Sequence, residues 1–234
     1  MRGKVAEFSS RSRQRMKRMI AATDMSKLPL FAHLTYPAEF SHDSKIYKAH
    51  LDNFSLRLLR HHPEASFIWK LEFQKRGAPH FHLFVWGVGD VEEFKLWLSK
   101  TWFEVVASGD VKHLAAGTRV ERIASRSKAM AYCSGYASKD DQTRPGDYVG
   151  RYWGACQRKN IPWAKLAHIE LTEKQAKVVR RTMRRFTLAS LREGFLRRRK
   201  LGIRCGKPRL RNNENIVAFL DGDFWLRCLQ QLLE

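Results

Sequence analysis

Two histidines, His80 and His82, stand one residue apart in the apolar run GAPHFHLFVWG at positions 77–87. In a strand, alternate residues point to the same face, so both imidazoles project together while Phe81 projects to the other face. Burying two unpaired imidazoles is unfavourable, so their face should carry water, a carboxylate or a metal ion. Glu72, in the preceding segment 65–74, would point to the same face as the two histidines if the two segments form a hairpin. Glu72, His80 and His82 are therefore candidate ligands of a divalent ion.

A second group of reactive residues lies in the segment AYCSGYASK, positions 131–139. Tyr132, Tyr136 and Lys139 are spaced i, i+4 and i+7, so a helix would place all three on one face. One interpretation is an ordinary amphipathic stripe. The other is a pair of nucleophiles with a cationic neighbour. A phenol with a pKa near 10 is mostly protonated at neutral pH, so its attack would need Lys139 or a metal ion nearby.

The hairpin that would position the first group is predicted from alternation. Residues 65–74 alternate as a strand, KRGAP at 75–79 reads as a turn, and 80–87 form the return strand. Glu72 then shares a face with the histidines, opposite an apolar face made by Phe67, Trp69, Leu71, Phe73, Phe81, Leu83 and Val85.

The rest of the chain mixes helices and strands, which predicts an α+β fold with a central antiparallel sheet and helices packed on it. On the first strand, His33 and Thr35 alternate and could face the same cavity as the histidine pair. Asp90 is the predicted N-cap of the helix that follows the hairpin. Strands are predicted at 28–37, 117–123 and 167–172, and a strand or turn at 148–154. Helices are predicted at 44–61, 88–106, 125–141 and 173–192, and a further strand and helix near the C-terminus.

The composition indicates a folded protein with a polyanionic partner. The net charge is +21, with 44% hydrophobic residues and seven tryptophans. Residues 1–18 carry +6 and residues 173–211 carry +13, so the charge sits in two flanking segments. These are interpreted either as solvated arms or as phosphate-contacting arms. The four cysteines are widely spaced without a CxxC pair, which fits a reducing cytosol better than a disulfide framework.

From about Phe31 to Trp153 the chain resembles the HUH single-strand endonucleases, in particular the two-tyrosine initiators of rolling-circle replication in phages and plasmids. AHLTYP is similar to the family's first motif, although His33 is a departure from its usual threonine-rich form. EFQKRGAPHFHLFVWG resembles the histidine block with its acidic ligand, and YCSGYASK resembles the Tyr-x3-Tyr-x2-Lys pattern. GRYWG resembles the glycine and tryptophan stretch that often follows.

The resemblance implies an RRM- or ferredoxin-like core and a metal-dependent enzyme that nicks and rejoins DNA. Glu72, His80 and His82 would bind Mg²⁺ or Mn²⁺, and Tyr132 and Tyr136 would be the nucleophiles, assisted by Lys139. One tyrosine would nick single-stranded origin DNA, leaving a 5′-phosphotyrosine and a free 3′-hydroxyl for a host polymerase. The other would attack the regenerated origin and allow the displaced circle to be closed.

The expected organisation is a basic N-terminal arm (1–27), an endonuclease domain (28–172) and a basic helical region (173–234). The last could also hold duplex origin DNA. The chain shows no GxxxxGK[ST] motif, so a host helicase is an expected partner. We expect no membrane association and a cytoplasmic location in a bacterial host cell. Alternatives are a relaxase or single-strand transposase of the same superfamily, or a non-enzymatic basic nucleic-acid-binding protein.

Overall fold

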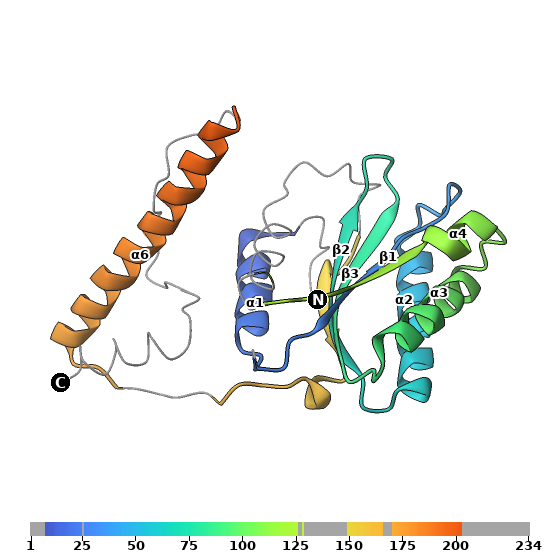
Figure 1. The fold of residues 1–234 in the computed structure, drawn as a ribbon, viewed down its shortest axis with the longest axis horizontal. Coiled ribbons are helices and arrows are strands. Elements are labelled where there is room, and N and C mark those ends of the chain that lie inside the picture. Colours follow the sequence, from blue (N-terminus) through green and yellow to red (C-terminus); the bar gives the residue numbers. More distant parts are fainter. Residues whose placement is uncertain (1–7, 25, 126–127, 129–148, 166–169, 203–234) are drawn as a thin grey trace, which may run out of the picture. The chain divides into compact units, whose positions relative to one another are not determined.

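The computed structural model divides into two units, Met1–Lys165 and Leu166–Glu234 (Figure 1). The residues that it describes are 8–24, 26–125, 128, 149–165 and 170–202. Tyr132, Tyr136 and Lys139 lie outside the described residues, as do nearly all of the predicted helix at 125–141 and the predicted C-terminal strand and helix.

The first unit is built on a five-stranded sheet in which every neighbouring pair is antiparallel. The strand order is β4-β1-β3-β2-β5, so the two hairpin strands lie inside the sheet and β5 lies at its edge. This sheet and its helices confirm the predicted α+β class. The strands are β1 (Leu30–Leu34), β2 (Ser66–Phe73), β3 (Pro79–Trp86), β4 (Thr118–Arg122) and β5 (Trp153–Cys156).

The β2–β3 hairpin forms in the predicted register. Glu72 pairs with His80 and Lys70 pairs with His82. The turn is closed by a hydrogen bond from the Gln74 amide to the Ala78 carbonyl, 2.9 Å long, and Gly77 adopts a φ of 82° that favours glycine. The predicted apolar face packs into the main core of the unit.

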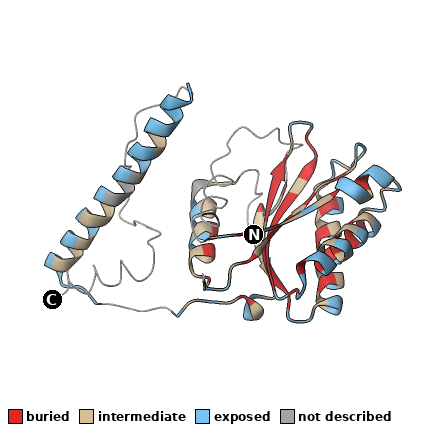
Figure 2. Cartoon of the chain, in the orientation of Figure 1, coloured by how far each residue is buried: buried red, intermediate tan, exposed pale blue. Residues whose placement is uncertain are grey.

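Helices α2 (Ser44–His61) and α3 (Val91–Val106) cover one face of this sheet, and α1 (Ser10–Ala21) lies on the other side (Figure 1). Phe54 of α2 and Trp102 of α3 are fully buried against the apolar face of the hairpin, where Figure 2 shows the buried residues concentrated. Asp90 caps α3 as predicted, accepting hydrogen bonds from the amides of Glu92 and Glu93. The short helices α4 (Val111–Ala116) and η1 (Arg158–Asn160) complete the described elements of this unit.

Two predicted strand positions differ from the structure. The segment predicted as a strand or turn at 148–154 is a strand only from Trp153 onwards, because β5 pairs with β2 through Gly154 opposite Trp69. The indole of Trp69 fills the space that a side chain at position 154 would need. At 167–172, the described residues 170–172 form no strand. They lead instead into the N-cap Thr172.

The described part of the second unit is a single long helix, α6 (Glu173–Lys200). It begins with a capping box between Thr172 and Gln175 and extends beyond the predicted end at 192. No helix in the described ranges combines the length and apolar character needed to span a bilayer.

Candidate metal centre

Three histidines meet on the sheet face opposite α2 and α3. His33 of β1 is the direct cross-strand partner of His82 on β3, and His80 lies two residues before His82 on the same strand face. One ring nitrogen from each of the three lies within 4.8 Å of the others. His33 Nδ1 and His80 Nε2 are 3.2 Å apart. This histidine cluster, His33, His80 and His82, is a candidate site for a divalent ion.

The surroundings of His33 favour a neutral imidazole. His82 is only 3% exposed, and its ring stacks on that of Phe31 with centroids 5.7 Å apart. Burial lowers the pKa of His33 to about 4, and the neighbouring His82 contributes in the same direction. An imidazole with this pKa is neutral at pH 7, and the neutral form is the one that binds metal ions.

Glu72 lies beside the cluster with both carboxylate oxygens engaged. Oε2 accepts a hydrogen bond from His82 Nε2 at 3.0 Å, and Oε1 forms an ion pair with the ammonium group of Lys70. Glu72 and Lys70 are 5% and 3% exposed. Burial by itself raises the pKa of Glu72, but the bond from His82 and the charges of His82 and Lys70 outweigh it and lower the pKa to about 2. The carboxylate is therefore ionised at neutral pH.

The structure thus brings the predicted residues Glu72, His80 and His82 together on one sheet face, as the hairpin phase requires. The set of clustered nitrogens, however, includes His33, which the sequence placed near the cavity without making it a ligand. Thr35, also expected to face the cavity, donates its hydroxyl to the carbonyl of Gly117 at 2.9 Å. The ion pair of Lys70 was not predicted, although its alternation with Glu72 along β2 was the available signal.

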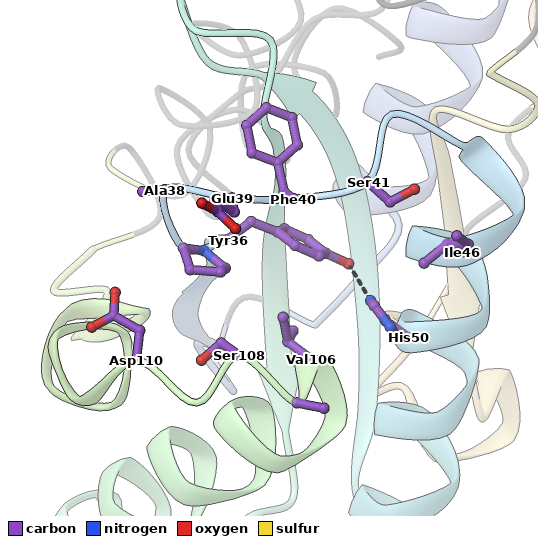
Figure 3. A pocket seen from close by; sticks show the side chains of 12 residues that line it. Tyr36, Ala38, Glu39, Phe40, Ser41, Ile46, His50, Val106, Ser108 and Asp110 are labelled. Atoms are coloured by element: carbon purple, nitrogen blue, oxygen red, sulfur yellow. Dashed lines mark hydrogen bonds between the residues drawn. The ribbon is translucent and has the colours of Figure 1, made fainter.

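A cavity of about 590 Å³ lies elsewhere in the first unit, between the segment after β1 and helices α2 and α3. Figure 3 shows Tyr36 reaching across it to His50, whose Nδ1 is 3.0 Å from the tyrosine hydroxyl. Burial raises the pKa of Tyr36 above its usual value, so this phenol stays protonated. Glu39 and Asp110 line the cavity, and no lysine or arginine among the described residues does. An anionic phosphate is therefore a poor ligand for this cavity.

Comparison with known proteins adds one finding. Residues 29–141 match a family model of replication-associated proteins, the one named after ORF2. The match covers slightly less than half of the chain and includes the histidine cluster, Glu72 and both predicted tyrosines. Searches of curated proteins and of solved structures each gave no match. The similarity suggests a replication-associated role and is consistent with a rolling-circle replication initiator.

Proposed function

We propose that this protein initiates rolling-circle replication by nicking and rejoining single-stranded origin DNA through a tyrosine nucleophile. The observation that carries the proposal is the histidine cluster beside an ionised carboxylate, on the central strands of a domain that matches a replication-associated family. Tyr132, Tyr136 and Lys139 also fall within the matched residues. The basic character of the chain fits a nucleic-acid substrate.

The donor atoms fit a divalent ion. His33, His80 and His82 would hold it, and Glu72, predicted as a ligand, would act by orienting His82 through the 3.0 Å hydrogen bond. Mg²⁺ is bound by oxygen ligands in near-ideal octahedral geometry, whereas first-row transition ions accept nitrogen ligands, with an affinity that rises from Mn²⁺ to Cu²⁺. Of the two ions predicted, we therefore propose Mn²⁺. When bound, such an ion supplies Lewis-acid polarisation of a phosphodiester.

The tyrosines would carry out the covalent step. The phenol oxygen of Tyr132 or Tyr136 would attack the phosphorus, and the P–O3′ bond would break. The 5′-phosphate would remain esterified to the tyrosine, while the 3′ oxygen would take up a proton and leave as a hydroxyl. The phenol must lose its proton as it attacks, and Lys139 would favour this by stabilising the phenolate charge. Reversal by a 3′-hydroxyl would rejoin the strand.

The test is an adduct assay with a random-sequence single-stranded library, labelled at the 3′ end and incubated with Mn²⁺. A 5′-phosphotyrosine retains the 3′-labelled fragment on denatured protein, whereas a 5′ label is released. We expect no adduct from the Tyr132→Phe/Tyr136→Phe double variant, and a matched Tyr36→Phe variant should keep the wild-type yield. Undiminished adduct from the double variant would overturn the nucleophile assignment. Salt-sensitive binding by the wild type without any adduct would favour a non-enzymatic binding protein.

Metal binding is tested separately from cleavage, by the rise in melting temperature that Mn²⁺ produces. We expect His33→Ala and His80→Ala/His82→Ala to abolish the rise, Glu72→Gln to reduce it, and His61→Ala, an exposed histidine on α2, to leave it unchanged. If Glu72→Gln abolishes the rise while His33→Ala preserves it, the ion is held by the set predicted from sequence, Glu72, His80 and His82.

A further inference from the structure

A groove of about 660 Å³ runs between α1 and the edge strand β5, in the first unit. One side of the groove is lined by α1, through residues that include Ser12 and Arg15, and by the N-cap Ser9. The other side is lined by residues 151–155 and by Arg158. The indole of Trp153 donates a hydrogen bond to the Ser12 hydroxyl at 2.9 Å and so ties the two sides together. Segments far apart in the sequence therefore build one site.

The groove is strongly cationic. Arg15, Arg151 and Arg158 line it, and no acidic residue among the described ones does. All three arginines are exposed, and none of them forms an ion pair with another residue that the structure describes. Guanidinium groups bind phosphate with two parallel hydrogen bonds, so three uncompensated arginines around a groove favour a phosphate-bearing ligand.

The groove is joined to the histidine cluster by direct strand pairing. His82 pairs with Lys70, and Lys70 pairs with Trp153, so these three residues form one row on the same face of the sheet. Neighbouring strands are about 4.8 Å apart, which places the row's two ends about 10 Å apart. In a base-stacked strand, which rises about 3.4 Å per nucleotide along its axis, this distance corresponds to about three nucleotides.

We infer that this arginine groove, defined by Arg15, Arg151 and Arg158, holds the sugar-phosphate backbone of the single strand a few nucleotides from the phosphate at the histidine cluster. The inference rests on the proposed function, because it assigns a path to the substrate of that site. The acidic cavity near Tyr36 offers no comparable charge among its described lining residues, and its Glu39 and Asp110 would repel a phosphate.

The test uses the full chain in EDTA, so that binding is measured without cleavage. The affinity for a single-stranded oligonucleotide is determined against salt for wild type and for Arg15→Ala/Arg151→Ala/Arg158→Ala. The matched control is Arg60→Ala/Lys100→Ala/Lys112→Ala, which removes the same charge from exposed positions on α2, α3 and α4. Loss of three phosphate contacts should reduce the slope of log K against log salt by about 2. The affinity advantage of wild type over the groove variant then falls roughly 15- to 20-fold between about 50 and about 200 mM salt.

An unchanged slope in the groove variant, or an equal change in the control, would overturn the inference. A slope change that is larger with duplex than with single strand would assign the groove to duplex DNA instead. Tight binding of inorganic triphosphate that the groove variant loses would assign it to a free nucleotide. The adduct assay tests the endonuclease proposal separately from the groove. If the groove variant forms adduct at the wild-type rate when DNA is saturating, the endonuclease proposal is supported, whether or not its slope of log K against log salt differs from that of the wild type. If wild type forms no adduct, the slopes still decide the groove.

Discussion

Replacing either partner of the buried Lys70–Glu72 ion pair should destabilise the first unit strongly, and replacing both should cost much less than the sum. Both residues are almost fully buried, so a lone partner would be left as an uncompensated buried charge. Removing one member of such a pair typically costs about 3–5 kcal/mol. We expect Lys70→Met to lower the free energy of unfolding by about 3 kcal/mol, because Glu72 keeps its bond to His82. We expect Glu72→Gln to lower it by about 5 kcal/mol, because this change leaves the Lys70 ammonium without its counter-charge.

The double variant Lys70→Met/Glu72→Gln removes both charges, and we expect a coupling energy of about 2–3 kcal/mol. The measurement is urea unfolding in EDTA, followed by tryptophan fluorescence. Six of the seven tryptophans lie in the first unit, so this signal reports mainly on the sheet domain. The matched control is the exposed pair Glu92–Lys95 on α3, whose neutralisation should change stability by less than about 1 kcal/mol.

Additive effects of Lys70→Met and Glu72→Gln, within about 0.5 kcal/mol, would refute this reasoning. They would mean that the two side chains are not coupled across a low-dielectric interior. The description of Glu72 as an engaged, ionised carboxylate beside the histidines would then be wrong as well.

Three further substitutions test the backbone that supports the site. Gly87→Ala should lower the melting temperature by several degrees, since its φ is 75° and an added Cβ would lie 2.4 Å from the Glu64 carbonyl oxygen. Gly154→Ala should separate β5 from β2, because the new Cβ would lie 2.8 Å from Trp69 Nε1; faster amide exchange in β5 would show it, and unchanged exchange would contradict it. Asp90→Ala should cost about 1 kcal/mol in urea unfolding by removing the α3 N-cap, whereas Asp90→Asn should cost less.

Much of the fold follows from local sequence patterns. The β2–β3 hairpin was predictable because apolar residues alternate on both sides of a turn that contains Gly77, and α3 because Asp90 precedes a helical apolar pattern. β5 was misplaced because its register depends on the Trp69 indole packing over Gly154, a long-range contact that no local pattern encodes. The helix α6 was placed correctly at its start, where Thr172 caps it, and extends past the predicted end through a run of arginines and lysine.

Only the part of the site that lies on the β2–β3 hairpin could be predicted from the sequence. Glu72, His80 and His82 share a face because both strands have a period of two residues. The place of His33 in the histidine cluster depends on how β1 pairs with β3, and a slip of one residue would have directed its imidazole to the opposite face. The arginine groove could not be predicted from the sequence, because α1 and β5 are far apart in the chain and are brought together only by the completed fold.

The position of Lys70 bears on which residues can hold a metal ion. Its ammonium group contacts the same carboxylate that the sequence motif offers as a ligand, so a divalent ion on Glu72 would have to compete with a buried positive charge. The burial that keeps His33 neutral, by contrast, also prepares its imidazole for ligation. In the proposed site Glu72 would therefore act as the acceptor that fixes the ring of His82, a role common to carboxylates beside metal-binding histidines.

On this reasoning Lys70→Met, by releasing one carboxylate oxygen, should raise the affinity for Mg²⁺ more than that for Mn²⁺, because oxygen is the ligand that Mg²⁺ requires. The measurement is the rise in melting temperature with each ion, taken relative to the metal-free form of the same variant so that the lost ion pair does not enter the comparison. Equal gains for the two ions, or no gain for Mg²⁺, would contradict the idea that Lys70 keeps Glu72 from acting as a direct ligand.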